Sequence, residues 1–156
     1  MINDKKYMMA AIKQGQVAKN LGDLPFGAVV VCDNKIVGRG ECRSLSGDVT
    51  DHAEILALRE ACKKLGRNNL SDCIIYCTNE PCVMCAATIF QAKIADVRFG
   101  LDREDLSIFL RKRNIRIKDL AKDSGYKIKI TKGIMRSEIL KQFDGAERKD
   151  DCFKKG

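Results

Sequence analysis

Several features that would define other classes of protein are missing from this chain of 156 residues. There is no run of eighteen apolar residues, so no membrane-spanning helix and no membrane partner are expected. The first six residues lack the apolar core of a signal peptide. Repeats, low-complexity tracts and linkers are absent as well, and the length suits one folded unit. We therefore expect a single domain over residues 1–156.

Aromatic residues, histidine and paired cysteines are also scarce. Aromatic side chains make up 6% of the chain, which gives little sign of a base-stacking platform for single-stranded nucleic acid. The eight cysteines do not follow the spacing of a disulfide framework, so we expect a reducing cytoplasm. His52 is the only histidine, and Cys82 and Cys85 form the only Cys-x-x-Cys pair. A structural zinc site built from two such pairs is therefore disfavoured.

The sequence does contain one set of metal-ligating residues. His52 is followed two positions later by Glu54, and Pro81-Cys82-Val83-Met84-Cys85 comes thirty residues after the histidine. One imidazole and two thiolates are three protein ligands, the number that a catalytic zinc ion carries when water takes the fourth position. We predict one Zn²⁺ per chain, bound by His52, Cys82 and Cys85. The alternative is a structural zinc closed by a fourth cysteine, and six are available: Cys32, Cys42, Cys62, Cys73, Cys77 and Cys152.

Glu54 has two interpretations. As a carboxylate that is not a ligand, it could move protons to and from a substrate. Alternatively, Asp51-x-x-Glu54 fits a capping box at the start of a helix. Residues two apart on a regular helix do not face each other, so His52 and Glu54 converge only if His52 lies in a distorted first turn. Pro81 suits the opening position of a second helix that carries both cysteines.

Apolar periodicity and turn residues predict an α/β fold with helices and strands in alternation. The predicted helices are Lys5–Asn20, Ala53–Leu65, Cys82–Gln91, segments from Glu104 to about Ala121, and Ser137–Phe143. The predicted strands are Ala28–Val31, Ile36–Gly40, Ile74–Thr78, Asp96–Leu101 and Lys127–Thr131. We expect a three-layer α/β/α domain with a largely parallel, mixed sheet of about five strands, the first two forming a hairpin.

The connection between the last two predicted strands decides their relative direction. A helix in this connection, beginning near Leu106, would require a parallel crossover, whereas a short turn would make a hairpin. About two dozen residues separate the strands, so we expect them to be parallel. An irregular insertion is the alternative.

At the metal motif the sequence resembles the zinc-dependent cytidine and nucleobase deaminase superfamily, whose signature is H-x-E followed by P-C-x-x-C. His52–Arg59 and Glu80–Ala86 are close to the forms found in the guanine, cytosine and tRNA adenosine deaminases. Leu24–Val31 looks like the glycine-containing loop and first strand of the same branch. The resemblance covers nearly the whole chain. A parallel final crossover fits this branch better than the free-cytidine deaminases.

The resemblance implies hydrolytic removal of an amino group from an aromatic heterocycle, with release of ammonia. Glu54 would take a proton from water and pass it to the ring and the departing amine. A homodimer is expected on the same grounds. Substrate contacts are expected in regions that contain Phe26, Cys42, Ala53, Asp102, Asp105 and Phe143. For the two aspartates the alternative is a helix cap, and for the two phenylalanines it is core packing.

The substrate is the least determined feature. A net charge of +8, densest over Arg111–Lys118, invites an RNA substrate, although a solvated basic surface explains the same run. In the related deaminases the second strand ends in Gly-x-Gly-x-Asn, whereas this chain has Cys42 in place of the asparagine. Because a thiol is a poor substitute for an amide, we predict a free base, with isocytosine and cytosine ahead of guanine. A tRNA anticodon adenosine is the alternative, and a noncatalytic zinc-stabilised binding module is a third reading.

Overall fold

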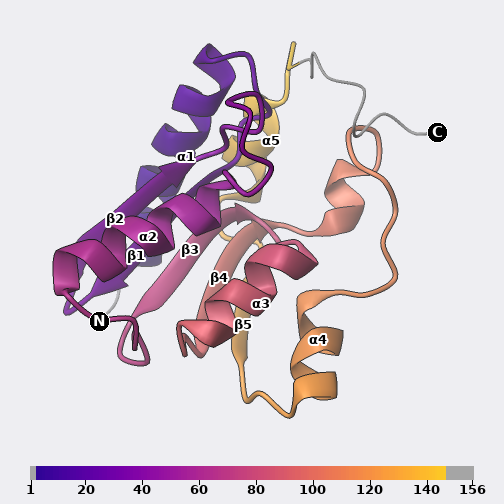
Figure 1. Ribbon diagram of the computed structural model, residues 1–156. Coiled ribbons are helices and arrows are strands. Elements are labelled where there is room, and N and C mark those ends of the chain that lie inside the picture. Colours follow the sequence, from indigo (N-terminus) through magenta and orange to yellow (C-terminus); the bar gives the residue numbers. More distant parts are fainter. Residues whose placement is uncertain (1–2, 147–156) are drawn as a thin grey trace.

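A five-stranded mixed sheet in the order β2-β1-β3-β4-β5 lies at the centre of the protein, whose computed structural model describes residues 3–146 (Figure 1). The strands are β1 (Gly27–Cys32), β2 (Lys35–Glu41), β3 (Ile74–Asn79), β4 (Asp96–Leu101) and β5 (Lys129–Lys132). β1 pairs with β2 and β3 in antiparallel fashion, and β4 pairs with β3 and β5 in parallel fashion. The predicted hairpin and the parallel final pair are therefore confirmed.

The sheet is evenly mixed rather than largely parallel, which corrects that part of the prediction. Asp33 and Asn34, the two residues between β1 and β2, both have positive φ, at 47° and 59°. Two such residues match the twist of a tight hairpin, so β2 turns back along β1. β1 is in turn antiparallel to β3, with Val31 opposite Ile74.

Helices cover both faces of the sheet, as the three-layer prediction requires (Figure 1). The helices are α1 (Asp4–Asn20), α2 (Ala53–Leu65), α3 (Val83–Gln91), α4 (Ile117–Ser124) and α5 (Arg136–Gln142). One apolar core joins the sheet to α2, α3 and the start of α4, and the other joins it to α1 and α5. Alternate strand residues feed the two cores: Val30 and Ile75 face the first, and Val29 and Tyr76 face the second.

The helical segments predicted from Glu104 to about Ala121 are present only at the two ends of that range. The structure has a short 3₁₀ helix, η1 (Arg103–Leu106), and then no regular helix until α4 begins at Ile117. Leu106 and Leu110 are buried, whereas Ile108 and Ile115 are 78% and 60% exposed, so the buried apolar stripe ends at Leu110. Side-chain bonds shape it instead, because Arg103 Nη2 donates to the Arg111 carbonyl oxygen at 2.7 Å. The alternative of an irregular insertion describes most of this crossover.

α2 and β4 have their predicted bounds, and the other elements differ from theirs by one or two residues. α3 begins at Val83, with Cys82 as its N-cap, so Pro81 precedes the helix rather than opening it. β5 starts two residues later than predicted, at Lys129, and α5 starts one residue earlier, at Arg136. Within residues 3–146, no helix is both long and apolar enough to cross a membrane.

Candidate active site

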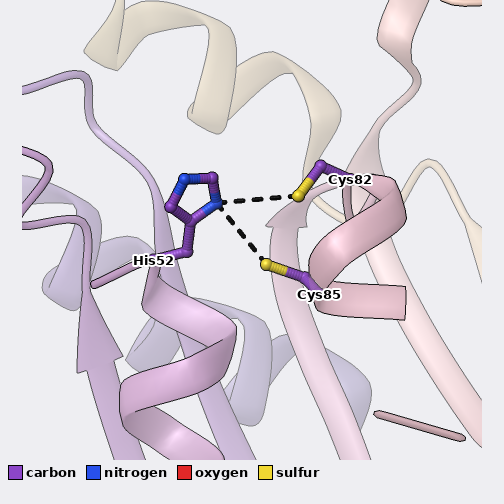
Figure 2. A group of neighbouring side chains, drawn as sticks. All are labelled: His52, Cys82 and Cys85. Atoms are coloured by element: carbon purple, nitrogen blue, oxygen red, sulfur yellow. Dashed lines mark hydrogen bonds between the residues drawn. The ribbon is translucent and has the colours of Figure 1, made fainter. Parts of the chain in front are cut away.

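Two helix N-termini converge at the end of the sheet where β2 and β3 finish. His52 is the N-cap of α2, and Cys82 is the N-cap of α3, with Cys85 in the first turn. Figure 2 shows the imidazole of His52 pointing at both sulfur atoms across the space between the two helices. His52 Nδ1 lies 3.7 Å from Cys82 Sγ and 3.5 Å from Cys85 Sγ. The predicted cluster is thus assembled, from residues thirty positions apart.

These distances fit a tetrahedral zinc ion. Zn–N and Zn–S bonds of about 2.0–2.1 Å and 2.3 Å give a tetrahedral N···S edge of about 3.5–3.6 Å. The two observed N···S distances agree with this edge, and all three ligand atoms lie within 4.8 Å of one another. In the part of the chain that the structure describes, no fourth histidine, cysteine or carboxylate completes this group. Cys152, one of the six alternative fourth ligands, lies outside the described residues.

The two thiols are in different electrostatic states. The pKa of Cys82 falls to about 4, first because the Cys85 thiol donates a hydrogen bond to its sulfur and then because the His52 ring lies in hydrogen-bond contact with it. The pKa of Cys85 rises well above its ordinary value, since its proton is engaged with Cys82 and its sulfur is buried. Both cysteines would bind a cation as thiolates, so metal binding at this point releases protons.

Glu54 lies in the first turn of α2 and is 5% exposed. Its pKa is raised, chiefly because burial disfavours the charged carboxylate and secondly because the Cys82 thiolate lies nearby. A carboxyl with a raised pKa can accept and return a proton near neutral pH. The alternative capping box does not form, because His52 occupies the N-cap and Asp51 accepts hydrogen bonds from Ser46 and Arg59.

Glycines on β2 bring α2 close to the sheet. A Cβ atom placed on Gly40 would lie 2.0 Å from the carbonyl oxygen of Ala53, and one on Gly38 would lie 2.1 Å from that of Ala57. Real Cβ atoms do not approach so closely, so only glycine permits this contact. Because Ala53 lies between His52 and Glu54, the contact at Gly40 sets the position of both functional side chains.

A cavity of about 210 Å³ opens over this cluster. Four predicted site residues line it beside the metal ligands: Phe26, Cys42, Ala53 and Glu54. Its remaining walls come from Val49, Asn79, Val83, Met84, Arg103, Leu110 and Arg113. Apolar walls surround the carboxyl of Glu54 and the amide of Asn79, and the guanidinium groups of Arg103 and Arg113 belong to the same lining. A flat heterocycle with a polar edge suits such a cavity.

Three predicted substrate contacts lie outside this lining. Asp102 and Asp105 form a capping box around η1, in which Asp105 Oδ2 accepts a hydrogen bond from the Asp102 N–H at 2.9 Å. Asp102 also pairs with Lys132 at 3.0 Å, and Asp105 pairs with Arg136 at 2.6 Å.

Phe143 packs behind the cavity wall rather than in it. It is 6% exposed, and its ring centroid lies 5.8 Å from that of Phe26, which does line the cavity. Phe109 lies on its other side, at 5.0 Å.

Sequence reasoning missed Asn79, Arg103 and Arg113 as lining residues. Arg113 belongs to the basic run noted in the sequence, but nothing in that run distinguishes it from its neighbours. Its place in the cavity depends on the irregular path of the chain after η1. Asn79 directly precedes the Glu80-Pro81-Cys82 motif, so its position could have been inferred from that proximity.

The fold and this site define a zinc-dependent deaminase with the cytidine deaminase fold, a hydrolase of C–N bonds. The profile of the MafB19-like deaminases matches residues 2–143. The chain belongs to that family.

The relatives that this chain resembles are named for different substrates. The chain is 38% identical, over 141 residues, to a tRNA-specific adenosine deaminase of Buchnera aphidicola subsp. Schizaphis graminum, and the match covers 88% of this chain and 89% of the relative. It is 44% identical to the guanine deaminase of Bacillus subtilis over 82 residues, which cover 52% and 53% of the two chains. A solved structure from work on tRNA:A34 deaminases that edit A to I superposes with a TM-score of 0.76 at 28% identity, covering 88% of this chain and 98% of that one.

Proposed function

We propose that this protein deaminates adenosine in the anticodon loop of a tRNA. The observation that carries the proposal is a pair of arginines, Arg103 and Arg113, in the wall of the cavity that contains Glu54. Among the described residues neither guanidinium has a carboxylate partner, whereas the neighbouring Arg116 pairs with both Glu80 and Glu104. A neutral free base would leave these two charges unmatched, but the phosphates flanking a nucleotide would match them.

The two arginines also affect each other. The pKa of Arg103 is lowered, first because its guanidinium is partly buried and then because Arg113 lies close by. Two like charges beside one cavity repel each other, and a bound phosphate would relieve that repulsion. Phosphate contacts of this kind position a nucleic acid, while the cavity reads the base.

The names of the relatives support the same choice. The tRNA adenosine deaminase match extends over nearly the full length of both chains, whereas the guanine deaminase match covers about half of each. The longer match favours a tRNA substrate over the free bases that the sequence analysis preferred.

In the proposed reaction the target base is flipped out of the anticodon loop into the cavity. His52, Cys82 and Cys85 would hold zinc, which supplies Lewis-acid activation of water. Glu54 holds and transfers protons at its carboxylate oxygens, and the apolar walls exclude bulk water from it. Phe26 offers an aromatic face at the side of the cavity.

A second candidate function is deamination of a free base such as isocytosine, cytosine or guanine. The observation that favours it is Cys42, which is 3% exposed and lines the cavity where related enzymes have an asparagine. A thiol gives weaker hydrogen bonds than an amide to a base edge or to a ribose held there. The noncatalytic binding module is the third reading, and zinc content without any turnover would support it.

The test compares the zinc-loaded protein on an anticodon stem-loop and on four free bases. Inosine is measured in the digested RNA, and ammonia release is measured for adenine, guanine, cytosine and isocytosine. We expect turnover on the stem-loop, with Arg103→Ala and Arg113→Ala raising its KM and lowering the slope of log affinity against log salt by about 0.7–1 per lost phosphate contact. Lys112→Ala is the matched control, because Lys112 is exposed and does not line the cavity. Robust turnover on a free base, with none on RNA, would overturn the proposal.

A further inference from the structure

A second group of metal-ligating side chains lies at the opposite end of the sheet from the active site. Cys32 is the last residue of β1, and Cys73 comes directly before β3. The two strands are antiparallel with Val31 opposite Ile74, so the next pair along the ladder is Cys32 and Cys73. The fold therefore places two cysteines, 41 positions apart in sequence, beside each other. Asp72, next to Cys73, adds a carboxylate to the pair.

The spacing of these three side chains matches that of metal ligands. Cys32 Sγ lies 3.5 Å from Asp72 Oδ2, and Cys73 Sγ lies 3.6 Å from Asp72 Oδ1. Zn–S and Zn–O bonds of about 2.3 Å and 2.0–2.2 Å give a tetrahedral S···O edge of about 3.5–3.7 Å, and each sulfur lies at that distance from a different oxygen of Asp72. One ligand atom from each of the three residues lies within 4.8 Å of the others, as in the His52 cluster.

Arg67 and the exposure of Asp72 define the surroundings of these three side chains. Arg67 Nη2 donates to both oxygens of Asp72, at 2.8 Å and 2.7 Å, and this ion pair fixes the carboxylate beside the two thiols; a bound metal would take one of these oxygens from Arg67. The same nitrogen lies 3.8 Å from Cys32 Sγ. With both thiol protons displaced by a metal, two thiolates, one carboxylate and one guanidinium would carry a net charge of −2, which a divalent cation neutralises. Both cysteines are buried, at 6% and 2% exposure, whereas the Asp72 side chain is 53% exposed, so water could reach the metal from that side.

We propose that Cys32, Asp72 and Cys73 form a second metal site, for a thiophilic divalent cation such as zinc. The ion would join the end of β1 to the start of β3 and leave its fourth position to water. This site does not depend on the proposed deaminase activity, because it lies at the far end of the sheet from Glu54.

The test counts zinc in variants that separate the two sites. The triple variant H52A/C82S/C85S removes the active-site ligands, and we expect it to keep one zinc equivalent after equilibrium dialysis. Adding C32S and C73S should remove that equivalent. C62S in the triple-variant background is the matched control, because Cys62 is a cysteine of α2 outside both clusters. Circular dichroism checks that each variant is folded.

Cobalt substitution gives a spectroscopic readout. In the triple variant, a thiolate-to-cobalt charge-transfer band that disappears on adding C32S and C73S, and that survives C62S, is assigned to Cys32 and Cys73. The surface substitution Asp72→Asn keeps both thiols and should weaken metal affinity by at least about tenfold. A folded triple variant that binds no zinc would overturn the proposal, as would zinc binding that survives the addition of C32S and C73S to the triple variant. A disulfide between these two cysteines in the purified protein, detected as a loss of two mass units and two free thiols, would overturn it too.

Discussion

Gly40→Ala tests whether the packing of β2 against α2 positions the active site. The new methyl group would lie 2.0 Å from the Ala53 carbonyl oxygen and 2.7 Å from the Ala57 nitrogen, whereas real Cβ contacts are at least 3.0 Å. The first turn of α2 must therefore move outward by about 1 Å, because the contact is to backbone rather than to a flexible side chain. His52 and Glu54, on either side of Ala53, would move with it.

The expected magnitude has two parts. Overpacking of this kind costs about 1–3 kcal/mol in the free energy of unfolding. For a domain of this size that corresponds to a fall in melting temperature of about 2–12 °C. A displacement of about 1 Å at a catalytic group costs roughly a hundredfold in rate. We therefore expect kcat per folded, zinc-loaded protein to fall by about that factor.

Gly38→Ala is the matched control for this change. Its methyl group would lie 2.1 Å from the Ala57 carbonyl oxygen, in the same strand and against the same helix, but one turn further from His52. Thermal unfolding should show a loss of stability in both variants. Only Gly40→Ala should also lose most of its zinc affinity or most of its kcat. Equal losses of kcat in the two variants, after correction for folded protein, would refute the reasoning.

Four further predictions concern the site and its supports. Glu54→Gln should keep zinc and fold but lose about a hundred- to ten-thousandfold in turnover, whereas loss of zinc with normal turnover per bound ion would make Glu54 structural. Substitution of His52, or removal of metal with a chelator, should lower zinc content and activity together, so full activity without metal would contradict the zinc site. Arg116→Ala should destabilise the fold by about 3–5 kcal/mol in chemical denaturation, because Glu80 is 7% exposed and would lose its paired guanidinium; a change below 1 kcal/mol would show that Glu80 finds another partner. Cys42→Asn should shift relative activity toward the substrates of the asparagine-containing relatives, and an unchanged substrate profile would remove Cys42 from base recognition.

The metal ligands and most of the fold were predictable because they depend on local patterns. Apolar periodicity located the β1 to β4 strands and the α2 helix within one or two residues. Spacing of three between Cys82 and Cys85 placed both thiols at one helix start. The helix prediction failed from Ser107 to Arg116, because no buried apolar residue follows Leu110 until Ile117. Side-chain bonds, such as that of Arg103 to the Arg111 carbonyl oxygen, shape the path of this segment.

The sequence by itself determined the chemistry, because one histidine and one Cys-x-x-Cys pair leave few ways to build a zinc site. Only the tertiary structure decided what surrounds that site. It placed Arg103 and Arg113 in the cavity wall. It used Asp102 and Asp105 to cap η1 and to form ion pairs with Lys132 and Arg136. It also brought Cys32 beside Cys73, through an antiparallel pairing that neither cysteine signals in the sequence. The physical reason is that ligand identity depends on residue type, whereas proximity between distant residues depends on strand order and on the course of the loops between elements.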